Sequence, residues 1–158
     1  MLQKIFLLAI ICFALACTKE STTIVDINDP NPSLADEPTI ALLSISSNTV
    51  LANQDSISFI IEYTDGNGDL GTSDPDLASI ELIDQRDAQT LVFLYHLQPL
   101  APENSDIAIT GELNIVLNHT ILLDENNDSE TTTFTIRLKD RAGNWSNTVE
   151  TEAITISK

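Results

Sequence analysis

The chain has 158 residues, and its 24 Asp and Glu against 7 Lys and Arg give a formal net charge of −17 at pH 7. This excess of carboxylates repels phosphate and anionic headgroups, so it disfavours nucleic acid as a partner and direct adsorption to an anionic bilayer. A chain of this length suits a single domain with tails.

The N-terminal segment, residues 1–16, predicts a lipoprotein signal peptide. Lys4 precedes an almost unbroken apolar run over residues 5–15, which is typical of a signal peptide and shorter than the roughly 20 residues that span a bilayer. The run ends in the sequence ALAC, which resembles the lipobox of bacterial lipoproteins, although the commonest lipobox has Leu first. We therefore expect cleavage before Cys17 and a covalent lipid, such as palmitate, on its thiol. An ordinary signal peptide cut near Ala16 is the alternative.

Cleavage would leave one cysteine and a more acidic mature chain. Cys12 lies in the discarded segment, so Cys17 would have no partner for an intramolecular disulfide. Loss of Lys4 leaves 6 basic against 24 acidic side chains, a net charge of −18. This balance favours solubility, divalent cations and basic partners.

Residues 17–38 are expected to form a disordered linker after the lipidated cysteine. Pro30, Pro32 and Pro38 exclude a regular helix, and Asp, Asn, Ser and Thr dominate without an apolar period to bury. Fully extended, at roughly 3.3 Å per residue, such a linker would hold the following domain a few nanometres from the membrane.

From residue 39 onward the pattern indicates β-strands. Residues 56–64 alternate most clearly, with Ile57, Phe59 and Ile61 on one side of the strand. Gly111 leaves two interpretations of its segment, which are two short strands or one strand with a bulge. The expected strands are residues 39–46, 56–64, 77–84, 90–98, 106–119, 130–139 and 148–157.

About seven short strands at intervals of about a dozen residues are typical of an immunoglobulin-like or fibronectin-like β-sandwich, and a barrel is the alternative. The Cys–Trp–Cys pattern of antibody domains is absent, so the disulfide-free versions fit better. The sequence therefore predicts an all-β protein with a signal peptide at 1–16, a linker at 17–38 and one sandwich domain at 39–158.

The loop after the second expected strand, DGNGDLGTSDPD over residues 65–76, has the composition of a calcium site. Its side-chain oxygens alternate with glycines that let the chain curl, and calcium prefers six to eight oxygen ligands. Relative to an EF-hand loop, the sixth position is Leu where Gly is expected, and the flanking segments are strands. A solvated acidic turn is the alternative. The candidate calcium ligands in this loop are Asp65, Asn67, Asp69, Asp74 and Asp76.

A second turn, DRAGN over residues 140–144, precedes the last expected strand. The DxAGN turn is similar to the closing loop of many bacterial immunoglobulin-like domains, and the DGNGDLG loop resembles a motif of small exported Bacteroidota lipoproteins. This resemblance implies a surface-associated immunoglobulin-like module. In such a sandwich both loops emerge at one end, so Asp140 is a sixth candidate calcium ligand. A plain hairpin turn is the alternative, and Asn144 and Trp145 are weaker candidates for ligand binding.

The motifs favour a binding role over catalysis. No GxSxG elbow is present and no pattern indicates a desolvated acid–base pair, so we expect a non-enzymatic protein. We expect an outer-membrane lipoprotein, on the periplasmic or cell-surface face, that acts as a calcium-stabilised binding or adhesion module for a protein or glycan. The alternative is a structural accessory subunit that packs against an outer-membrane protein complex.

Overall fold

The structure, a computed structural model, describes residues 34–87 and 91–158. The expected signal peptide, Cys17 and nearly all of the linker lie outside the described residues, so cleavage and lipidation stay predictions. Within the described ranges, no helix has the length and hydropathy needed to span a bilayer.

The described chain is all-β, as the sequence predicts, with a single 3-10 turn, η1 (Gln85–Asp87). Its strands are β1 (Thr39–Ile45), β2 (Thr49–Leu51), β3 (Ile57–Asp65), β4 (Ile80–Asp84), β5 (Val92–Tyr95), β6 (Ile109–Leu117), β7 (Ser129–Thr132), β8 (Phe134–Leu138), β9 (Val149–Glu150) and β10 (Ile154–Ser157).

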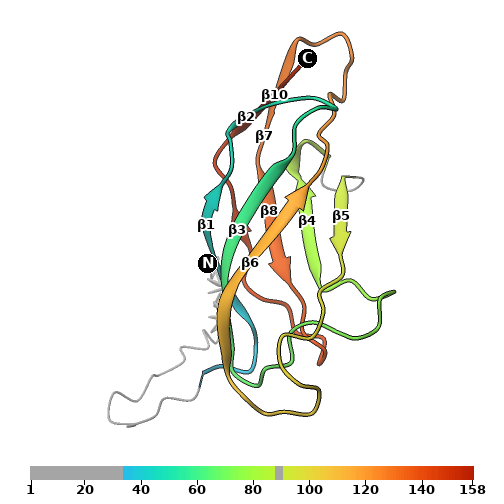
Figure 1. Cartoon of the computed structure of the whole chain (residues 1–158). Helices are drawn as coiled ribbons and strands as arrows, with labels where there is room; N and C mark the ends of the chain where they lie inside the picture. The colour runs from blue at the N-terminus through green and yellow to red at the C-terminus, as the bar shows by residue number, and fades with distance from the viewer. Residues whose placement is uncertain (1–33, 88–90) are drawn as a thin grey trace, which may run out of the picture. The chain divides into compact units, whose positions relative to one another are not determined.

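Two sheets form the layers of a β-sandwich (Figure 1). One layer has the strand order β1-β3-β6 and the other has the order β5-β4-β8-β9, with antiparallel pairing throughout. A third sheet, β2-β10-β7, extends the sandwich at the end where the C-terminus lies (Figure 1). This third sheet continues the second layer, because only Thr133 separates β7 from β8. Within it, β10 pairs with β7 in antiparallel and with β2 in parallel.

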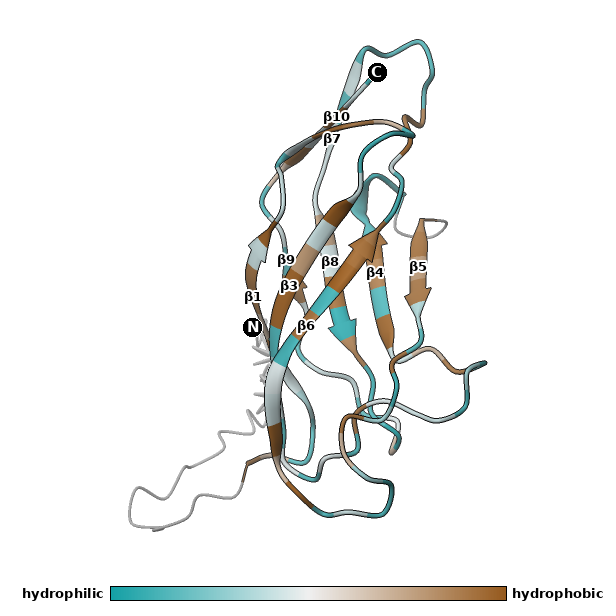
Figure 2. Ribbon diagram, viewed as in Figure 1, coloured by the Kyte–Doolittle hydropathy of each residue, from teal (hydrophilic) through white to brown (hydrophobic). Residues whose placement is uncertain are grey.

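The core between the layers is built by residues that alternate inward along the strands. Ile57, Phe59 and Ile61 are fully buried on β3, as the alternation predicts, and Phe134 and Leu138 are fully buried on β8. The rings of Phe59 and Phe134 lie 5.4 Å apart between centroids, which joins the two layers. Burying one such side chain contributes about 1.5–3 kcal/mol. Figure 2 shows the alternation as brown and teal segments along β4 and β6.

Gly111 neither breaks nor bulges its strand. β6 runs through it in unbroken register with β3, and Gly111 lies opposite Tyr63. A Cβ atom at position 111 would lie 2.7 Å from the Tyr63 hydroxyl oxygen, so the glycine makes room for this ring. The structure thus corrects both interpretations of the segment: it is one continuous strand whose glycine serves packing.

Two strands expected from the sequence are divided in the structure, and one strand is added. Residues 130–139 divide into β7 and β8 at Thr133, and residues 148–157 divide into β9 and β10. The short β2 is an addition that the sequence pattern does not reveal. The described chain therefore has ten strands rather than about seven, but the sandwich they build is the one expected.

Candidate functional site

The loop that follows β3, residues 66–76, packs closely against the backbone of neighbouring segments through its glycines. Gly68 and Gly71 adopt positive φ angles of 71° and 79°, which favour glycine. A Cβ atom would collide with the carbonyl oxygen of Ala35 at Gly66, of Ile107 at Gly68 and of Gln98 at Gly71. The glycines therefore serve close backbone packing, a role that the residue pattern of the loop does not reveal.

Asp65, the last residue of β3, is a fully buried carboxylate with one unsatisfied oxygen. Its side chain is 0% exposed, and its Oδ2 accepts a hydrogen bond from the Leu70 amide at 3.1 Å. Its Oδ1 is buried and has no hydrogen-bond partner. A buried acceptor without a partner costs about 1–3 kcal/mol, and more when it is charged. The fold therefore buries a carboxylate oxygen whose missing interaction a bound ligand could supply.

Asp69 presents a second oxygen of the same kind. Its Oδ2 accepts a hydrogen bond from the Ala142 amide at 3.1 Å, and its main-chain oxygen accepts one from the Arg141 amide at 3.2 Å. Its Oδ1 is buried without a partner. Leu70 forms a β-bridge with Asp140, so the two acidic loops meet at one end of the sandwich as the sequence analysis expected.

Asp140 is buried beside these carboxylates but is already satisfied. It is 6% exposed, and Asn144 donates its main-chain N–H to Oδ1 at 2.7 Å and its side-chain Nδ2 to Oδ2 at 2.9 Å. Asn144 therefore orients Asp140, which makes this turn a stable hairpin. In the first loop, Asn67 Oδ1 accepts a hydrogen bond from the Asp69 amide at 3.2 Å.

Burial and neighbouring charge raise the pKa of Asp65 and of Asp69. Burial raises the pKa of Asp65, and the charges of Asp69 and Asp140 raise it further, against the lowering effect of the Leu70 amide. Burial also raises the pKa of Asp69, and the charge of Asp140 adds to this effect. A cation or a proton placed among them would relieve the repulsion.

The remaining two candidate ligands lie elsewhere. Asp74 and Asp76 are exposed in the following turn, where Asp74 Oδ1 accepts a hydrogen bond from the Asp76 amide at 3.0 Å. Over residues 34–87 and 91–158, no group of three or more His, Cys, Asp or Glu is arranged so that it could hold a metal ion on its own. A cation between Asp65 and Asp69 would therefore need amide, main-chain or water oxygens to complete its shell.

Trp145 lies near this end of the sandwich and is half-exposed. The residue is 37% exposed, and the Arg137 guanidinium lies over its ring, with 3.9 Å from Cζ to the ring centroid. The Lys139 ammonium lies 5.4 Å from the same centroid. The ring is thus held by cation–π contacts, which contribute about 0.5–1 kcal/mol each at exposed sites.

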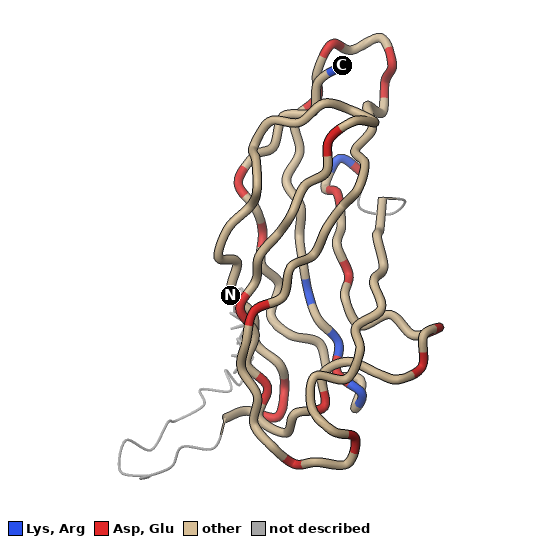
Figure 3. Tube along the Cα trace, viewed as in Figure 1, with Lys and Arg blue, Asp and Glu red and all other residues tan. Residues whose placement is uncertain are grey.

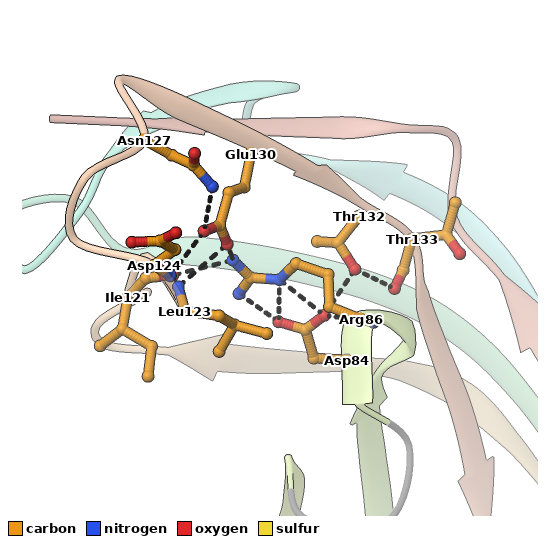
Figure 4. Close-up of polar contacts among 9 residues, drawn as sticks. All are labelled: Asp84, Arg86, Ile121, Leu123, Asp124, Asn127, Glu130, Thr132 and Thr133. Carbon is orange, nitrogen blue, oxygen red and sulfur yellow. Dashed lines mark hydrogen bonds and ion pairs between the residues drawn. The ribbon is translucent and has the colours of Figure 1, made fainter.

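A buried polar network near β7 was not found by sequence reasoning. Figure 4 shows the Arg86 guanidinium between Asp84 and Glu130. Arg86 Nη2 lies 2.5 Å from Asp84 Oδ2, and Nη1 lies 2.6 Å from Glu130 Oε2. The Leu123 and Asp124 amides also donate to Glu130, and their hydrogen bonds lower its pKa to about 2. The network fastens the loop before β7 to β4, which indicates a structural role.

Comparisons with known proteins give little. No family model matches the chain, and no curated protein matches it. Among solved structures, the chain is similar to the SrpA adhesin of Streptococcus sanguinis, crystallised as a point mutant, with 20% identity and a TM-score of 0.30. The match covers 77% of this chain and 56% of the adhesin chain, so the chain spans about half of that protein's length.

Proposed function

We propose that this chain is a membrane-anchored, non-enzymatic binding module whose loop end is stabilised by calcium. The observation that carries the proposal is the pair of buried, unpartnered carboxylate oxygens, Asp65 Oδ1 and Asp69 Oδ1. Both carboxyl groups have raised pKa values because burial and neighbouring charge oppose their ionisation. A protein that keeps such groups together gains stability when a cation enters.

The chemistry of the donors favours calcium over a transition metal. Every donor in the cluster is an oxygen, and hard cations prefer carboxylate, amide and carbonyl oxygens. Asp65 and Asp69 would bind the ion directly, and the neighbouring Asn67 amide and main-chain oxygens would supply further ligands. Asp140 would contribute negative charge from its position against Asn144. Magnesium demands a near-ideal octahedron, which a loop fixed by backbone packing is less able to supply.

Bound calcium would cross-link two segments that are distant in sequence. The loop at Asp65–Asp69 and the turn at Asp140–Asn144 already share a β-bridge and the Ala142 hydrogen bond. An ion on this side would neutralise the repulsion that works against those contacts. The loop end would then present a rigid surface for recognition, which is the role that we assign to it.

The membrane address rests on the N-terminal sequence. The apolar run ending at Cys17 supports export and lipidation, and the proline-rich linker supports display at a distance from the bilayer. We place the protein in the outer membrane, on its periplasmic or cell-surface face. Replacing Cys17 by alanine in the full chain should move the protein from the membrane fraction to the soluble fraction. Retention of the Cys17→Ala variant in the membrane would contradict the anchor.

The direct test of the calcium site is titration calorimetry on the mature lipoprotein, stripped with EDTA and held in a non-ionic detergent. We expect calcium to bind with one site per chain and magnesium to bind more weakly. Asp65→Asn and Asp69→Asn should each remove calcium binding, whereas Asp74→Asn and Asp76→Asn, which lie in the exposed turn, should not. Absence of calcium binding to the wild type, or its loss in the Asp74 and Asp76 variants, would overturn the proposed site.

A further inference from the structure

The outer face of the β5-β4-β8 sheet carries basic, aromatic and apolar side chains together. Leu94 on β5 lies opposite Glu81 on β4, and Glu81 lies opposite Arg137 on β8, so the three share one face. Ile80 and Leu82 beside Glu81 are buried, which shows that the shared face points outward. Figure 2 shows β5 as mostly brown, although it lies at the edge of its sheet.

The positive charge of this acidic protein gathers at one end of that face. The basic residues of the described chain are Arg86, Arg137, Lys139, Arg141 and Lys158. Three of them follow one another at alternate positions from β8 into the next turn, where Figure 3 shows a run of blue. Arg137 pairs with Glu81 at 2.6 Å, but Lys139 and Arg141 form no ion pair with any described residue. The charge of Arg141 acts on Asp69 and the Lys139 ammonium lies beside the Trp145 ring, but neither cation has a described carboxylate within ion-pair distance, so both can still face an anion.

A hollow lies between these cations. Its volume is about 350 Å³. Lys139 and Arg141 line it together with Asp140, Leu77 and the small residues Ala78 and Ser79, and both oxygens of the Asp140 carboxylate already accept hydrogen bonds from Asn144. This volume is at the lower end of the range for ligand sites in proteins, about 300–1,000 Å³. The Arg141 guanidinium is held in place by the Gly71 carbonyl oxygen, to which Nη1 donates at 2.7 Å.

Exposed apolar side chains lie in the hollow, beside Lys139 and on the adjoining face of the sheet. Leu94 is 62% exposed, Leu77 is 56% exposed and Trp145 is 37% exposed. The centre of a protein interface is enriched in aromatic residues and arginine and is apolar around them. An acidic polysaccharide could pair with the cations, but it has no apolar side chains to cover the two leucines. The combination therefore fits a polypeptide better.

We propose that this face docks a partner protein through an acidic segment whose carboxylates enter the hollow at Lys139 and Arg141 while its apolar side chains cover Leu77, Leu94 and Trp145. The hollow lies in the segments that precede β4 and follow β8, and not along the edge of β5, so side chains rather than strand addition make the contact.

The test is fluorescence anisotropy with the mature lipoprotein in detergent and short labelled peptides in which Glu alternates with Leu. We expect saturable binding that weakens as salt is raised, and no binding of the matched peptides in which Lys replaces Glu. Lys139→Glu should weaken binding by about tenfold or more, because it reverses a charge that faces the peptide. Leu77→Ser should also weaken binding, since the serine no longer covers apolar surface.

Lys158→Glu is the matched control. It makes the same charge change at the other end of the sandwich, where Lys158 is exposed and lies 3.5 Å from Asp128. Binding should stay unchanged in this variant, and all variants should melt within a few degrees of the wild type. The proposal is overturned by equal binding to wild type and Lys139→Glu, by equal loss in Lys158→Glu, or by binding of polygalacturonate without binding of any acidic peptide.

Discussion

Replacing Asp65 by asparagine is expected to stabilise the protein in EDTA and to abolish its response to calcium. The asparagine oxygen can still accept the hydrogen bond from the Leu70 amide, so the local backbone contact is kept. The change removes the buried negative charge and replaces the unpartnered Oδ1 by an amide N–H donor that faces the carboxylates of Asp69 and Asp140. The isosteric shape leaves the packing around β3 intact.

The size of the effect follows from the state of that oxygen. A buried acceptor without a partner costs about 1–3 kcal/mol, so Asp65→Asn should raise the free energy of unfolding in EDTA by about this amount. For a domain of this size the gain corresponds to a rise in Tm of roughly 3–10 °C. Calcium at 100 times its Kd should add about 2.7 kcal/mol to the wild type and nothing to the variant. The difference in unfolding free energy between the two proteins should therefore change by about 2.7 kcal/mol between EDTA and calcium.

Urea denaturation of both proteins in EDTA and in calcium measures these quantities, with Asp76→Asn as the exposed control that should stay within about 0.5 kcal/mol of the wild type. A pH series adds a check. The folded-state pKa of Asp65 is raised, so its ionisation destabilises the fold above that pKa and the penalty is relieved as pH falls through it. The advantage of the variant in EDTA should thus shrink on acidification. A variant that is less stable than the wild type in EDTA, or that responds equally to calcium, would refute the reasoning.

Three other expectations concern the fold. Gly71→Ala should lower the free energy of unfolding by about 2 kcal/mol or more, because a left-handed conformation and a backbone collision both oppose the Cβ atom, whereas Gly143→Ala, with φ 97° and open space, should lose only about 1–2 kcal/mol. Equal losses in urea titrations would contradict this account. Phe134→Ala should cost about 3–5 kcal/mol in the same assay, since the ring fills the core between the layers. The pKa of Glu130 is lowered to about 2, so its contribution is present above the unfolded value and is lost as pH falls towards 2. Glu130→Gln should therefore flatten the acid limb of the stability curve, and an unchanged limb would argue against the hydrogen bonds that Glu130 accepts from the Leu123 and Asp124 amides.

The sequence predicted the sandwich because the strand signal is local. Alternation over residues 56–64 places every second side chain in the core, and one face of β3 is buried as this pattern requires. The division of the next-to-last expected strand at Thr133 could not be predicted in this way. It depends on distant partners: the Thr132 hydroxyl donates to Asp84, and the Thr151 hydroxyl accepts from the Phe134 amide. The spacing of residues along the sequence does not reveal such contacts.

The candidate site was predictable to a similar extent. Alternate oxygen-bearing residues at Asp65 and Asp69 pointed to the buried cluster, and the turn at Asp140 lies beside it. Asp74 and Asp76 are not part of this cluster. The chain turns outward after Gly71, and the EF-hand spacing does not apply to a loop between strands. The sequence could not show which carboxylate oxygens lack a hydrogen-bond partner. That depends on the hydrogen bonds of both loops, which only the folded structure provides.

The hydrogen bond from the Gly66 amide to the Ala35 carbonyl, at 2.9 Å, has a mechanical consequence. It fixes the end of the linker beside the carboxylate loop, so the chain enters the sandwich at the same end as Asp65, Asp69 and the basic hollow. If the chain is anchored through Cys17 and a partner docks at the basic hollow, as we propose, the force between them would run between two points at one end and would not cross the sandwich lengthwise. The load would then fall first on the Ala35–Gly66 contact and on the pairing of β1 with β3. Calcium in the adjacent loop would stiffen the part of the molecule that carries this tension.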